Sequence, residues 1–194
     1  MRHLQSLALL SLATALMAGC ATAAPGARGA EAPSSVDAGI DAETSVVDPE
    51  AAATADAWLE EAVLPRGAVR SESVPRATVP FSSSYYSWPC SPMETRTGYW
   101  TIDDADVIDT ANWLTAHPTA DLIVPVPGTL SPDPKVDSAL VGNVPEHDAL
   151  EGIAYTVSRT DDGVAIRAEI GVFTKDTVCP TLPPGHTWGG PGQG

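Results

Sequence analysis

The sequence predicts an α+β fold: a small antiparallel sheet of about four to five strands, two helices packed on one of its faces, and long Pro/Gly-rich loops. Two segments, residues 48–63 and 103–116, place apolar side chains at helical spacing. The best-defined strands alternate with period two around an Asp-Gly turn at residues 161–163, which indicates an antiparallel hairpin. Helices and strands do not alternate regularly, so the order favours α+β over a parallel α/β sheet.

The first helix is expected to begin at residues 48–50. Aspartate is a good N-cap, proline fits the first helical position, and an acidic side chain favours the first turn. Apolar side chains continue at helical spacing over residues 55–63, and Leu64-Pro65 ends the helix. Trp58 is therefore expected to anchor the core rather than to contact a ligand.

The segment between the two helices is expected to be mostly irregular. One short strand is expected near residues 68–74. Residues 80–92 contain three prolines, five serines and four aromatic residues, a composition typical of a loop. Residues 98–102 are expected to form the next strand.

The second helix is expected to begin at Asp103, with Asp106 three residues on in an imperfect capping-box arrangement. His117-Pro118 ends it, because the residue before a proline disfavours helical backbone. Strands are then expected over residues 120–126 and near residues 136–141.

The clearest strands form the hairpin, residues 153–158 and 164–172. From Cys179 onward the chain is rich in proline and glycine. We therefore expect a single domain over residues 48–179, followed by a flexible tail over residues 180–194.

The N-terminus predicts export. A short basic start, an apolar run over residues 4–17 and a small-residue exit are typical of a secretory signal peptide. The run of about 14 residues is shorter than the ~20 needed to span a membrane. Cys20 directly follows Ala18-Gly19, as in a bacterial lipoprotein signal, in which this cysteine becomes the first mature residue and carries acyl chains such as palmitate. The alternative is an ordinary secretory signal cut near residues 21–24.

The predicted localisation is the extracytoplasmic face of the cell membrane, with the protein anchored through lipid on Cys20, or secreted under the alternative. Residues 1–19 are then the signal peptide. Residues 20–47 are rich in Ala, Ser, Gly and Pro and contain no aromatic residue, so they are expected to form a disordered tether.

The chain has three cysteines, and lipidation of Cys20 leaves Cys90 and Cys179 as a pair. In an oxidising compartment this pair is expected to form a disulfide; two buried free thiols are the alternative. Neither cysteine belongs to a CxxC motif, so no metal site is expected at them.

The formal net charge is −15, from 25 acidic and 10 basic residues. Such a charge repels nucleic acid, which is excluded as a partner, and favours solubility or a cationic partner. The acidic cluster over residues 103–109 is expected to serve the helix start rather than a metal ion. No cofactor is expected.

No catalytic motif is present. His117, His147 and His186 are far apart in the sequence, and the serines lie in no GxSxG or SxxK motif. His117 is expected to end a helix and His147 to lie in a solvated loop.

An aromatic group is the best candidate for a binding surface, because aromatic rings combine a large apolar face with a polar edge. The alternative is that these rings cover a small sheet beside the disulfide. The candidate binding residues are Tyr85, Tyr86, Trp88 and Trp100, with Tyr99 beside them.

Three stretches carry further motifs: Leu64-Pro65-Arg66-Gly67-Ala68 after Trp58-Leu59, Trp113-Leu114-Thr115-Ala116-His117-Pro118, and Asp162-Gly163-Val164-Ala165-Ile166-Arg167-Ala168. In this order they resemble a group of uncharacterised secreted or lipid-anchored proteins of actinobacteria. The likeness covers about residues 55–173, and Thr119 stands where the group often has a second proline. No activity is known for the group, so the resemblance implies no function.

Together these features predict a non-enzymatic binding module of the cell envelope, attached to the membrane by its N-terminal lipid and recognising a protein or glycan partner. A cell-envelope hydrolase and a carrier of a small apolar ligand are the alternatives.

Overall fold

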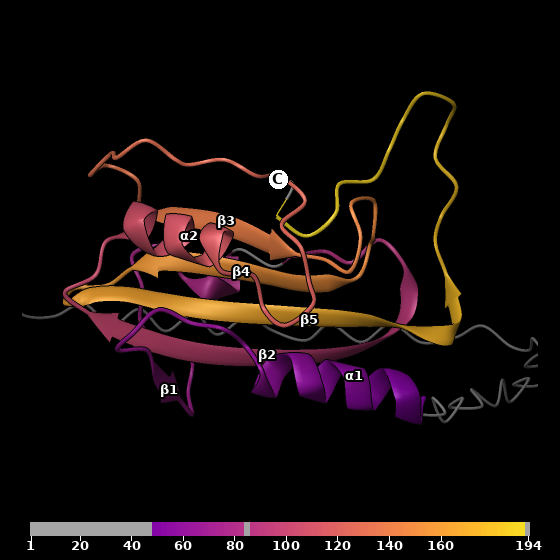
Figure 1. The fold of residues 1–194 in the computed structure, drawn as a ribbon, viewed down its shortest axis with the longest axis horizontal. Coiled ribbons are helices and arrows are strands. Elements are labelled where there is room, and N and C mark those ends of the chain that lie inside the picture. The colour runs from indigo at the N-terminus through magenta and orange to yellow at the C-terminus, as the bar shows by residue number, and fades with distance from the viewer. Residues whose placement is uncertain (1–47, 84–85, 193–194) are drawn as a thin grey trace, which may run out of the picture. The chain divides into compact units, whose positions relative to one another are not determined.

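A computed structural model describes residues 48–83 and 86–192 of the chain. The predicted signal peptide, Cys20, the tether and Tyr85 lie outside the described residues. The predicted α+β class is confirmed by two α-helices and a five-stranded antiparallel sheet in the order β1-β2-β5-β4-β3 (Figure 1). The elements are α1 (Pro49–Glu60), β1 (Val69–Ser71), the 3-10 helix η1 (Phe81–Ser83), β2 (Ser91–Asp103), α2 (Val107–Ala116), β3 (Ser138–Asn143), β4 (Gly152–Arg159) and β5 (Gly163–Val178).

The hairpin lies where the period-two pattern predicts it. β4 and β5 pair antiparallel from Gly152 opposite Gly171 to Arg159 opposite Val164. β5 continues to Val178 and also pairs with almost the whole of β2. β5 is therefore the central strand of the sheet, with β2 on one side and β4 on the other.

Both helices begin at aspartate caps, but the second cap is not the predicted one. The Asp48 carboxylate accepts from the backbone N–H groups of Glu50 and Ala51 at the start of α1. At α2 the cap is Asp106, which accepts from Ile108 N at 2.8 Å, and not Asp103. Asp103 still belongs to β2. The next residue, Asp104, has a left-handed backbone conformation that turns the chain before the helix begins.

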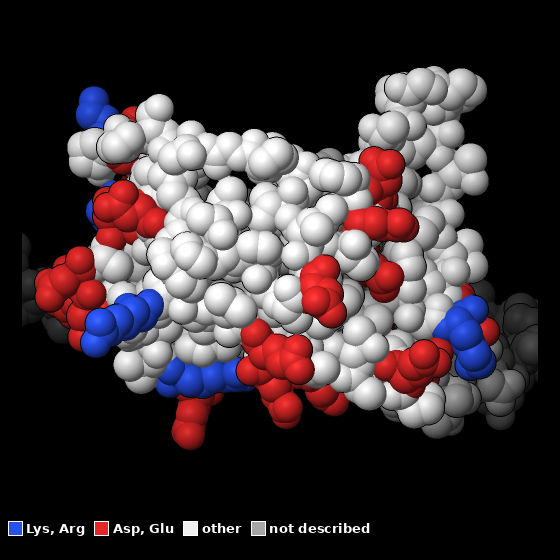
Figure 2. All heavy atoms as spheres, in the orientation of Figure 1, with Lys and Arg blue, Asp and Glu red and all other residues white. Residues whose placement is uncertain are grey.

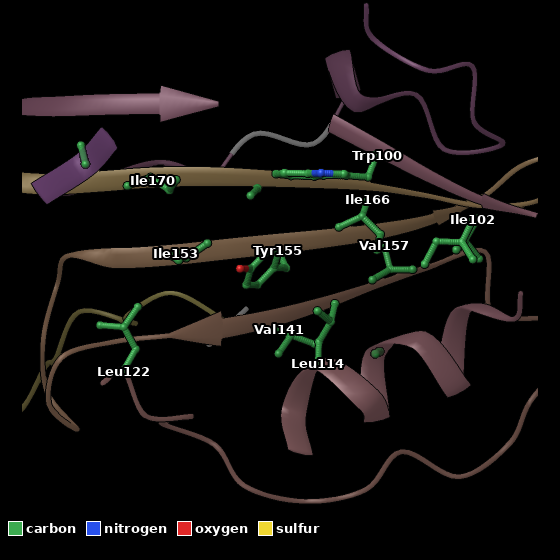
Figure 3. Close-up of a cluster of buried hydrophobic side chains, with 14 of the residues drawn as sticks. Trp100, Ile102, Leu114, Leu122, Val141, Ile153, Tyr155, Val157, Ile166 and Ile170 are labelled. Atoms are coloured by element: carbon green, nitrogen blue, oxygen red, sulfur yellow. The ribbon is translucent and has the colours of Figure 1, made fainter. Parts of the chain in front are cut away.

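One face of the sheet carries the hydrophobic core, and both helices cover it (Figure 1). α1 packs on β2 and β5, and α2 on β3 and β4. Leu114 of α2 lies beside Val141 of β3 (Figure 3). Gly98 leaves room for Trp100, because a Cβ at residue 98 would lie 2.6 Å from that ring.

The strand predicted over residues 120–126 is wrong. In this segment Ile123 makes a single bridge to Val144 beyond the end of β3, with both hydrogen bonds at 2.8 Å. Pro125 and Pro127 follow at once, and since proline has no N–H to donate, the pairing stops there. The strand predicted at residues 98–102, in contrast, is part of the much longer β2.

The other face of the sheet is also covered, although its side chains are small or polar. Residues 78–83 and 86–90, here called the roof, cross this face. At one end Thr78 N donates to Arg159 O at 2.8 Å, and the Ser158 hydroxyl donates to Val79 O at 3.1 Å. At the other end Trp88 lies so close to Gly171 that a Cβ there would be 2.6 Å from the indole. β4 and most of β5 are consequently buried on both faces.

Candidate functional site

The roof holds two of the four predicted aromatic binding residues. Tyr86 and Trp88 are half-buried, and their rings meet edge-on with centroids 4.6 Å apart. Phe81 is buried and packs on Tyr99 of β2 at 5.7 Å. Trp100, by contrast, is 5% exposed in the core on the opposite face, so its ring offers no surface to a ligand. The described aromatic residues of the roof therefore cover the sheet, which was the alternative left open by the sequence.

A buried ion pair fixes the roof to β5. Arg167 Nη2 lies 2.7 Å from Glu169 Oε2, and the two side chains are 1% and 11% exposed. Arg167 Nη1 donates to Phe81 O at 2.7 Å, and Tyr86 N donates to Glu169 Oε2 at 3.1 Å. Burial raises the pKa of Glu169, against the opposing effects of the Tyr86 N–H bond and the Arg167 charge.

The predicted disulfide is confirmed. Cys90, directly before β2, is bonded to Cys179, directly after β5 and 89 residues later in the sequence. The bond joins the end of the roof to the start of residues 180–192, here called the tail.

Two further contacts hold the tail. The Tyr86 hydroxyl donates to Gly189 O at 3.1 Å. At Gly142 of β3 the backbone of Pro191 comes so close that a Cβ on residue 142 would lie 1.8 Å from Pro191 O. The tail is thus attached to the domain at its start, near its end and at Gly189.

Between these attachments the tail rises beside the connection from β3 to β4 (yellow and orange in Figure 1). The two segments border an open pocket of about 450 Å³, here called the tail pocket. Its lining combines apolar side chains, two imidazoles and a carboxylate. The lining residues are His147, Asp148, Leu150, Pro180, Leu182, His186, Thr187, Trp188 and Gly190.

Trp188 is the aromatic residue of the tail pocket. It is 39% exposed, and its indole Nε1 donates to Pro180 O at 3.0 Å across the base of the tail. This bond satisfies the polar atom of the indole and fixes the ring, so that Trp188 presents carbon to the pocket.

The structure brings together two of the three histidines that follow the predicted signal peptide. His147 and His186 both line the tail pocket, whereas His117 ends α2 and stacks on Trp113 with centroids 4.2 Å apart. Within residues 48–83 and 86–192, no three His, Cys, Asp or Glu side chains are placed to share a metal ion. In the acidic segment 103–109, Asp106 caps α2.

A second, smaller cavity of about 220 Å³ lies between β3 and the segment after Ile123, and no charged residue lines it. Acidic side chains (red) border much of the face shown in Figure 2, whereas the tail, at the upper right, is uncharged.

Sequence reasoning missed Trp188 because it stands in a Pro/Gly-rich terminus without periodicity. One signal was present: Leu182 and Trp188 are large apolar residues in the Pro/Gly-rich stretch that follows Cys179. The neighbourhood of His147 and His186 could not be predicted, because it depends on the disulfide and on contacts between distant segments.

No family model matches the chain, and no curated protein or solved structure is significantly similar to it. No helix among the described residues is both long and apolar enough to cross a membrane. Fold and candidate site together describe an α+β protein with a pocket of mixed polar and apolar lining close to its disulfide.

Proposed function

We propose that this protein is a lipid-anchored, non-enzymatic binding protein on the extracytoplasmic face of the cell membrane, and that the tail pocket holds a component of the cell envelope. The tail pocket carries the proposal: it combines exposed Trp188 with two imidazoles and a carboxylate, in the size range of ~300–1,000 Å³ typical of small-ligand sites. The N-terminal signal and Cys20 support the location.

The lining of the tail pocket favours binding over hydrolysis. Leucine, proline and tryptophan provide shape and apolar contact, and His147, Asp148 and His186 provide hydrogen bonds. Thr187 is the one hydroxyl side chain among the residues that line it. Hydrolysis by a hydroxyl nucleophile requires a base hydrogen-bonded to the hydroxyl and a third group that orients the base. Binding a ligand does not require this arrangement.

The core favours the tail pocket over an internal cavity for an apolar ligand. Such a ligand would lie between the helices and the sheet. Large side chains fill this layer instead, among them Trp100, Leu114 and Tyr155, which are 5%, 1% and 0% exposed (Figure 3).

Membrane attachment is tested with Cys20→Ser. In a bacterial host that processes lipoproteins, the wild-type chain is expected in the membrane fraction and the variant in the soluble exported fraction, with Thr22→Ser as a control that keeps the anchor. Unchanged membrane attachment of Cys20→Ser would contradict the lipid anchor.

Binding is tested with the Cys20→Ser chain and fractionated cell-envelope material, measured by sedimentation. The chain is expected to bind one fraction, and Trp188→Ala in the same background is expected to lose that binding. Val74→Ala is the matched control, because Val74 is 58% exposed and lies outside the pocket lining. Equal binding by Trp188→Ala and Val74→Ala would remove the tail pocket as the site.

A further inference from the structure

The side chains that line the tail pocket are suited to one class of ligand. Resting on the function proposed above, we infer that it binds a neutral saccharide, with a sugar ring against the indole of Trp188 and sugar hydroxyls bonded by His147, Asp148 and His186.

The aromatic wall is the first argument. A pyranose ring carries C–H groups on its faces and hydroxyls around its edge, so it matches an aromatic face that is bordered by polar groups. Trp188 meets this description: it is 39% exposed, it lines the pocket, and its N–H is already bonded to Pro180 O at 3.0 Å. Because that N–H is used within the tail, the indole contributes its carbon surface to the ligand.

The polar wall is the second argument. The Asp148 carboxylate only accepts hydrogen bonds, an imidazole can donate from one nitrogen and accept at the other, and the Thr187 hydroxyl does both. A ligand that satisfies this set must itself donate and accept at several neighbouring points. Sugar hydroxyls have this property, whereas an acyl chain does not.

Charge is the third argument. No lysine or arginine lines the pocket, and the one carboxylate there, Asp148, repels an anion. The tail contains no Asp, Glu, Lys or Arg over residues 180–192, and Asp148 is the one carboxylate among the residues that line the pocket (Figure 2). A neutral ligand avoids both the repulsion and the cost of burying a poorly paired charge.

Attachment of the tail is the fourth argument. The disulfide at Cys179, the Tyr86–Gly189 hydrogen bond and the contact at Gly142 hold the Trp188 wall before a ligand arrives. A wall held in this way reduces the entropy that binding must overcome, which matters for a saccharide because each of its contacts is weak.

The test uses the purified full chain with its lipid, in detergent micelles, and a panel of neutral tetrasaccharides built from glucose, mannose, galactose or N-acetylglucosamine. Binding is measured by saturation-transfer NMR and by titration of tryptophan fluorescence. At least one tetrasaccharide is expected to bind with a Kd below about 1 mM. Trp188→Ala should weaken this binding about tenfold or more, and Trp188→Phe, which keeps an aromatic face, should retain most of it.

Asp148→Asn tests the polar wall, because it keeps the size of the side chain and removes the acceptor-only carboxylate; it should weaken binding severalfold. Circular dichroism verifies that each variant is folded, and Val74→Ala is the control. The inference is overturned if no tetrasaccharide binds with a Kd below about 1 mM, or if Trp188→Ala binds as well as Trp188→Phe.

The two proposals fail in different ways. If envelope material binds through Trp188 while the whole panel fails, the binding function stands and the ligand is not a neutral saccharide; a protein partner is then indicated. If envelope binding does not depend on Trp188 and the panel also fails, the tail pocket is not a binding site.

Discussion

The Tyr86 hydroxyl donates a hydrogen bond to the carbonyl oxygen of Gly189, at 3.1 Å and across 103 residues of sequence. It joins the roof to the tail. Tyr86→Phe keeps the ring packed on Trp88 and removes this bond, so the free energy of unfolding should fall by about 1 kcal/mol in urea denaturation. Amide hydrogen exchange over residues 180–192 should become faster, while exchange in β4 stays unchanged. Unaltered exchange in the tail would show that the bond does not hold it.

Burial raises the pKa of Tyr86 to about 12, above the ordinary value of about 10. The folded protein therefore keeps the phenol protonated at a pH where the unfolded chain ionises it. The contribution of Tyr86 to stability is complete below pH ~10 and is lost as the pH rises toward 12. Tyr86→Phe should flatten this part of the pH–stability curve. Burial also raises the pKa of Tyr155 to about 12. Tyr155 should therefore account for the slope of the pH–stability curve that remains in the variant.

Arg167→Met tests the buried ion pair under the roof. It leaves the Glu169 carboxylate, 11% exposed, without the guanidinium 2.7 Å away. Since removing one member of a buried pair leaves an uncompensated charge, the free energy of unfolding at pH 7 should fall by about 3 kcal/mol. Thr97→Ala is the control, because residue 97 is opposite Glu169 on β2 but exposed. A variant as stable as this control would show that the pair adds no stability.

The same pair makes a prediction for pH. The pKa of Glu169 is raised in the folded protein, so the folded state takes up a proton more readily than the unfolded chain. The contribution of Glu169 to stability should therefore increase as the pH falls through its folded pKa, and level off below the unfolded value of roughly 4.3. Glu169→Gln has no titrating group at this position, so the stability of the variant relative to the wild type should fall on mild acidification. A relative stability that rises would contradict the raised pKa.

Thr119 connects the ends of both helices to the sheet. Its hydroxyl accepts from Val63 N at 3.0 Å and lies 2.8 Å from the Tyr155 hydroxyl, and its N–H donates to Asn143 Oδ1 at 2.9 Å. Thr119→Val keeps the shape and leaves a buried hydroxyl without its partner, which should cost about 2 kcal/mol. Tyr155→Phe removes the other hydroxyl, and the double variant should lose less than the sum of the two losses. Additive losses would show that the two hydroxyls do not interact.

Replacing both Cys90 and Cys179 by serine removes the covalent bond between two residues that lie 89 positions apart in the sequence. In the chain-entropy model this should lower the free energy of unfolding by up to about 4 kcal/mol. The tail should also exchange its amide hydrogens faster. Adding a reductant to the wild type should reproduce both effects and leave the double-serine variant unchanged. A reductant effect on that variant would point to another cause.

Local signals in the sequence predict much of the fold. The β4–β5 hairpin follows from period-two alternation around an Asp-Gly turn, and α1 follows from Asp48-Pro49 and apolar spacing. α2 was predicted with the wrong cap, because Asp103 and Asp106 are equally good caps in isolation and the β2–β5 pairing decides between them.

The roof could not be predicted. Arg167 and Glu169 alternate with apolar residues on β5, and this pattern is typical of a strand with one solvated face. Their burial depends on Phe81 and Tyr86, more than 80 residues earlier, which reach them across the sheet. The tail pocket has the same origin: each of its two walls is irregular, and tertiary contacts alone place one beside the other.

The two faces of β5 differ in what opening them would expose. Separating α1 and α2 from the sheet exposes apolar side chains such as Ile166 and Ile170. Exposing this hydrocarbon surface to water is unfavourable in free energy. Lifting the roof uncovers a guanidinium, a carboxylate and the Thr156 hydroxyl, which water can solvate. Opening the roof should therefore expose less hydrocarbon than separating the helices, and because Tyr86 is bonded to Gly189, it would also loosen the wall that carries Trp188.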